Sequence, residues 1–134
     1  MSPELRQLIS YRVERARESL DEARFNFERG SINLAANRLY YAVFYAVGGL
    51  LLAHQMESTK HSGVRALFIQ HFIKTGRFPR EYSDLYNKLF KMRTDADYAD
   101  LTRVPASFVS ENLRSVERFI NVIAEELKTM GYTL

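Results

Sequence analysis

The sequence of 134 residues contains no cysteine and only three prolines. Without cysteine the chain can form no disulfide, thiolate metal site or cysteine nucleophile. The N-terminus lacks the basic and then apolar pattern of an export signal, so we expect a cytoplasmic protein. Hydrophobic residues make up 46% of the chain and charged residues 26%, as in ordinary globular proteins. This length suits one core, which predicts a single domain over residues 1–134.

The sequence also lacks a long hydrophobic run. The uncharged stretch from Leu39 to Ala53 is 15 residues long and contains Gly48 and Gly49. A membrane-spanning helix needs about 20 apolar residues. We therefore predict a central helix buried by its neighbours, and no membrane span.

Strand-like alternation is absent, whereas helical periodicity recurs along the chain. Proline and capping residues mark the expected helix starts, and glycine marks several ends. The predicted helices run from Ser2 to Arg29, from about Ser31 to His54, from Ser62 to Lys74, from Pro79 until the pattern weakens after Arg93, and from Pro105 to Gly131. Four substantial helices and one shorter helix predict an all-α fold, an antiparallel up-down bundle.

Metal-binding patterns are weak. The Glu-x-x-His motif of di-iron bundles does not occur, and the three histidines lack the spacing of a zinc site. Asp95, Asp97 and Asp100 are too loosely spaced to predict a magnesium site. We therefore predict neither a metal nor a cofactor.

Positive charge is concentrated between Lys60 and Arg93. This segment holds eight lysines and arginines but only two acidic residues, whereas the whole chain has a net charge of +3. Such a segment could form a face that attracts phosphates, or its side chains could simply solvate helix surfaces. Composition leaves both interpretations open.

Two polar clusters interrupt the helical pattern. Asn37 and Arg38 enter the apolar second helix, where they either pair with a carboxylate or present donors to a ligand phosphate. Arg93 and Asp97 lie four residues apart, the spacing of an ordinary helical ion pair, and Tyr98 follows them as a residue that could cap the core.

Three segments together resemble an uncharacterised prokaryotic branch of the HEPN family: Asn37 to Ala46, Lys60 to Val64, and Arg93 to Tyr98. The resemblance covers roughly the middle half of the chain. It implies a helical bundle, a homodimer, and a minimal nucleotidyltransferase as partner in a toxin–antitoxin pair. The candidate nucleotide- or RNA-binding residues are Asn37, Arg38, Tyr41, Lys60, Arg93 and Tyr98.

Nuclease members of the family carry an arginine followed, after four to six residues, by a histidine. Arg93 matches that arginine, but residues 98–100 are tyrosine, alanine and aspartate. Asp97 is a candidate replacement base, and His61 is another if the fold carries it to Arg93.

Two functions therefore stay open. The first is a binding module for a nucleotide or RNA that partners a nucleotidyltransferase, with Tyr98 as a residue that the partner could modify. The second is a metal-independent endoribonuclease that uses Arg93 with Asp97 or His61.

Overall fold

The computed structural model describes residues 2–98 and 103–134, with side chains up to residue 95 and from residue 103. All regular structure in these residues is helical, which confirms the all-α prediction. The elements are α1 (Pro3–Glu28), α2 (Ile32–Ala53), α3 (His61–Phe68), the π-helical turn η1 (Ile69–Ile73), α4 (Arg80–Tyr98) and α5 (Ala106–Thr129).

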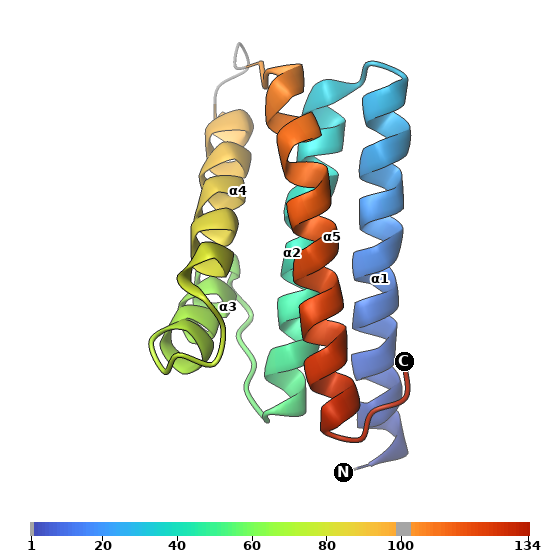
Figure 1. Cartoon of the computed structure of the whole chain (residues 1–134), viewed down its shortest axis with the longest axis vertical. Coiled ribbons are helices and arrows are strands. Elements are labelled where there is room, and N and C mark those ends of the chain that lie inside the picture. The colour runs from blue at the N-terminus through green and yellow to red at the C-terminus, as the bar shows by residue number, and fades with distance from the viewer. Residues whose placement is uncertain (1, 99–102) are drawn as a thin grey trace.

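The four long helices run alternately up and down, with both termini at the same end of the bundle (Figure 1). α2 packs against α1, α3, α4 and α5 and is the central element. The predicted antiparallel bundle of four main helices with one shorter helix is therefore confirmed.

The predicted local signals act at several helix ends. Ser2 caps α1, because its Oγ accepts a hydrogen bond from the backbone N–H of Leu5 at 3.1 Å. Gly30 follows α1 with a φ of +82°, a left-handed conformation that glycine adopts without a steric penalty. The short connector after it returns α2 antiparallel to α1 (Figure 1).

The uncharged stretch of α2 lies inside the bundle. Leu39, Val43, Ala46, Val47 and Leu50 are fully buried there. No helix among the described residues is long and apolar enough to cross a membrane. The apolar run is therefore explained by packing between helices.

The third helix differs from the prediction. The expected continuous helix over residues 62–74 is α3 followed by a π-helical turn, in which the N–H of Lys74 donates to the carbonyl of Ile69 at 2.9 Å. Phe68 and Phe72 are both buried and their ring centroids lie 6.0 Å apart. A periodic sequence pattern does not distinguish one wide turn from a regular one, because both keep apolar residues on the inner face.

The connector before α3 lies close to the start of that helix. A Cβ atom at position 63 would overlap Ser58 Oγ and would lie 3.0 Å from Ser58 Cβ, so glycine permits this approach. Ser58 Oγ in turn accepts from the backbone N–H of Lys60 at 3.3 Å. These contacts fix the turn that delivers His61 as the first residue of α3.

Candidate functional site

One face of α2 is only partly covered by the other helices. Asn37, Arg38, Tyr41, Phe44 and Tyr45 are half-buried and recur at helical spacing along this face. α1 borders it on one side, and residues of α3 and α4 border it on the other. Polar side chains on this face are therefore held by packing and still reach the surface.

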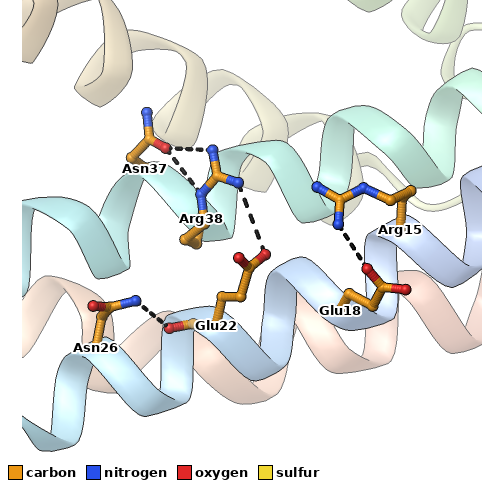
Figure 2. Close-up of polar contacts among 6 residues, drawn as sticks. All are labelled: Arg15, Glu18, Glu22, Asn26, Asn37 and Arg38. Atoms are coloured by element: carbon orange, nitrogen blue, oxygen red, sulfur yellow. Dashed lines mark hydrogen bonds and ion pairs between the residues drawn. The ribbon is translucent and has the colours of Figure 1, made fainter.

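Arg38 is tied to its surroundings by several contacts. Its Nε and Nη2 donate to Asn37 Oδ1 at 3.1 and 2.8 Å, and its Nη1 lies 3.8 Å from Glu22 Oε1 on α1 (Figure 2). The guanidinium carbon also lies 4.9 Å from the centroid of the Tyr41 ring. Arg38 thus has the carboxylate partner that a structural role requires, and its contact with phosphate stays a prediction.

A second ion pair, Arg15 with Glu18 on α1, also lies beside this face of α2. Arg15 donates to Glu18 at 2.7 Å (Figure 2), and its guanidinium carbon lies 5.2 Å from the Tyr45 ring centroid. The hydrogen bond to Glu18, with a further one to Tyr45, raises the pKa of Arg15 above its ordinary value. Arg15 therefore stays fully charged beside this face of α2.

Arg93 reaches the same face from α4. Its guanidinium carbon lies 5.1 Å from the Tyr40 ring centroid and 5.7 Å from the Tyr41 ring centroid. A cation over an aromatic ring is attracted by the partial negative charge on the face of the ring. Arg93 is therefore positioned by two consecutive tyrosines of α2.

His61 meets the same tyrosine from α3. Its Nδ1 lies 2.7 Å from the hydroxyl of Tyr40, and its ring stacks on Phe44 at a centroid distance of 4.2 Å and an interplanar angle of 6°. Either the Tyr40 hydroxyl donates to Nδ1, or Nδ1–H donates to the Tyr40 oxygen and Nε2 is then the basic nitrogen. The contact therefore sets the orientation of His61.

Tyr40 links the two residues that the sequence analysis could not bring together. Arg93 lies over its ring and His61 contacts its hydroxyl, although the three residues come from α4, α2 and α3. We call Arg38, Tyr40, Tyr41, His61 and Arg93 the arginine–tyrosine cluster. Tyr40 itself was not among the predicted site residues, and the signal for it was a polar-tipped residue in an otherwise apolar helix.

The structure describes the side chains of only some of the remaining predicted residues. Lys60 is exposed and directly precedes His61. The side chains of Asp97 and Tyr98 lie outside the described residues, so their predicted roles stay predictions. Asp95 pairs with Lys91 at 2.8 Å.

The described part of the chain contains no group of three histidine, aspartate or glutamate residues that could hold a metal ion. Of the three aspartates weighed as magnesium ligands, the side chain of Asp97 and the whole of Asp100 lie outside that part.

The HEPN domain model matches residues 9–127. The chain therefore belongs to the HEPN family. The matched HEPN region includes every residue of the arginine–tyrosine cluster.

Two relatives align over nearly the whole chain, and a third aligns over about two thirds of it. A UPF0332 protein of Thermotoga maritima is 37% identical over 95% of this chain and 96% of its own length. A protein of Methanocaldococcus jannaschii named "Putative toxin" is 30% identical over 96% of this chain and 95% of its own length. A second protein so named in that organism is 36% identical over 64% of this chain and 58% of its own length.

Two buried tyrosines provide a test of the Tyr40–His61 contact. We expect Tyr40→Phe to lower the free energy of unfolding by about 1 kcal/mol, because it removes a hydrogen bond and leaves the ring in place. Tyr86 is the matched control, since it is also fully buried but its hydroxyl has no described hydrogen-bond partner. Burial accordingly raises the pKa of Tyr86.

Urea denaturation of both variants is the measurement. Tyr86→Phe should leave stability unchanged or raise it, because it removes a hydroxyl that is buried without a partner. Equal effects of the two substitutions would show that the Tyr40–His61 contact contributes nothing specific.

Proposed function

We propose that this HEPN protein binds single-stranded RNA at the arginine–tyrosine cluster, as the toxin-type component of a toxin–antitoxin pair. The observation that carries the proposal is that Arg38 lies over the Tyr41 ring and Arg93 over the Tyr40 and Tyr41 rings, beside His61. The two relatives named "Putative toxin" support the toxin-type role.

The chemistry of the cluster suits a flexible nucleic acid strand. A guanidinium group donates several hydrogen bonds in a fixed plane that matches the oxygens of a phosphate. Aromatic rings stack on unpaired bases with little dependence on sequence. Arg38 and Arg93 supply the first function, and the guanidinium groups over the partly exposed Tyr41 ring give a base a flat surface to stack on.

Two arginine-to-glutamine substitutions, each of which removes one positive charge, test the binding site. We expect Arg93→Gln to weaken the affinity for a short single-stranded RNA about tenfold and to make its salt dependence shallower, because one phosphate contact is lost. Arg114→Gln, on the exposed surface of α5, removes the same charge away from the cluster.

Fluorescence anisotropy over a salt series measures both quantities. Equal affinities of the two variants would mean that only net charge attracts RNA, which contradicts a site at the cluster.

A second candidate function is metal-independent RNA cleavage, favoured by the meeting of His61 and Arg93 at Tyr40. In this reaction a base takes the proton of the RNA 2′-hydroxyl, and the 2′-oxygen forms a bond to the adjacent phosphorus. The bond from phosphorus to the 5′-oxygen breaks, that oxygen takes up a proton, and a 2′,3′-cyclic phosphate remains. Arg93 would stabilise the charge that develops on the phosphate oxygens.

Cleavage of a labelled RNA pool in EDTA distinguishes the proposed bases. If His61 transfers the proton, His61→Asn should lower the rate about 100-fold or more while Asp97→Asn changes it little. The reverse ranking would assign the base to Asp97. Wild-type protein that binds RNA and leaves it intact at every protein concentration would rule out the nuclease reading and leave binding as the function.

We also propose a minimal nucleotidyltransferase as the partner and a homodimer as the assembly, both implied by the family resemblance. The partner would transfer a nucleotide to Tyr98: the phenolic oxygen attacks the α-phosphorus of ATP, pyrophosphate leaves, and the phenolic proton passes to solvent.

Mass spectrometry after incubation with such a partner and ATP tests the transfer. We expect a mass increase on the peptide that contains Tyr98 and none on the same peptide of Tyr98→Phe. An unchanged wild-type mass would contradict the modification, and sedimentation of the untreated chain tests the homodimer separately.

A further inference from the structure

A groove of about 310 Å³ lies beside the arginine–tyrosine cluster, between α1, α2 and the connector to α3. Its lining includes Leu8 and Tyr11 of α1, Phe44 and Tyr45 of α2, and Met56 of the connector. Leu8 and Tyr11 are 38% and 54% exposed. The groove is therefore an open site with aromatic walls.

Polar groups at the groove are fixed in place. Arg12 donates from Nη1 to the carbonyl of Gly48 at 3.1 Å, and its Nη2 lies 3.3 Å from Glu57 Oε1. The groove thus presents a guanidinium and a carboxylate next to apolar walls. A nucleobase has the complementary shape and chemistry, with flat apolar faces and a polar edge of donors and acceptors.

The groove adjoins the cluster at Phe44. One side chain both lines the groove and stacks on His61 at 4.2 Å. Phe44 therefore forms a wall of the groove and contacts the cluster, so the two sites lie next to each other.

Tyr41 of the cluster and Tyr45 of the groove are neighbours on α2. The rings of Tyr41 and Tyr45, one helical turn apart, have centroids 6.0 Å from each other. Arg38 lies over the first ring and Arg15 over the second. Successive guanidinium groups therefore follow the same path from the cluster to the groove, as a phosphate backbone requires.

We infer that this groove receives the unstacked base of the nucleotide next to the one held at the cluster, an inference that rests on the proposed RNA binding. Its volume is at the lower end of the range for small-ligand sites, roughly 300 to 1,000 Å³, which suits one base. A base in a duplex stays stacked on its neighbours and cannot enter. The site consequently selects single-stranded RNA of at least two nucleotides.

Two exposed aromatic residues of α1 provide a matched pair for the test. Tyr11 lines the groove, whereas Phe25, 60% exposed, lies on the same helix outside it. We expect Tyr11→Ala to weaken the affinity for a short single-stranded RNA about tenfold, the size expected for one lost base–aromatic stack. Phe25→Ala should bind as the wild type does, and thermal unfolding checks that both variants keep the fold.

RNAs that each carry one abasic nucleotide locate the effect. In the wild-type protein, one abasic position should weaken binding about tenfold, and in Tyr11→Ala the same position should cost nothing further. A mononucleotide should bind Tyr11→Ala and the wild type equally, because it occupies only the cluster.

The outcomes separate this inference from the proposed function. Wild-type affinity of Tyr11→Ala, together with weakened binding by Arg93→Gln, would overturn the groove assignment and keep RNA binding at the cluster. A wild-type protein that binds no RNA would overturn both. Unchanged RNA affinity with altered sedimentation of Tyr11→Ala would assign the groove to an interface between copies of the chain and overturn the inference.

Discussion

The arrangement of the site depends on one buried hydroxyl group. Tyr40 is fully buried on the central helix, and its hydroxyl lies 2.7 Å from His61 Nδ1. A buried polar group left without a partner costs about 1–3 kcal/mol. The contact between this hydroxyl and His61 holds the first turn of α3 against α2. The guanidinium group of Arg93 lies over the ring of the same tyrosine. The burial of Tyr40 in the core therefore also determines where His61 and Arg93 lie.

Tyr86 shows that burial of a tyrosine does not by itself impose such a contact. It is as buried as Tyr40 and its ring centroid lies 6.4 Å from that of Tyr40, yet its hydroxyl has no described hydrogen-bond partner. The fold thus tolerates one unsatisfied phenol in the same aromatic cluster. The difference lies in the neighbouring residue, because the hydroxyl of Tyr40 meets His61 at the start of α3.

Local sequence signals were sufficient for most of the fold. Pro3, Gly30 and the periodic apolar positions predicted helices close to their observed bounds, because caps and amphipathic faces are properties of neighbouring residues. The π-helical turn Ile69–Ile73 was missed, because a single wide turn leaves almost no mark on periodicity.

The site was predictable only in part. Arg38, Tyr41, His61 and Arg93 were found from short motifs, but no pattern pairs Tyr40 with a histidine 21 positions away. For the same reason, the sequence did not predict Glu22 as the partner of Arg38 or α1 as a wall of the groove. Contacts between helices depend on how the helices pack, which short-range patterns do not encode.

The placement of the histidine changes what the proposed nuclease would require. In the family motif the arginine and the histidine follow one another along the chain, so one segment carries both. Here His61 begins α3 and Arg93 lies on α4, and Tyr40 of α2 is the contact that they share. Opening of α3 would withdraw the proposed base and leave the two arginines on α2 and α4. In such a site the packing of α3 on α2 would control the proposed proton transfer, whereas the proposed phosphate binding would persist without it.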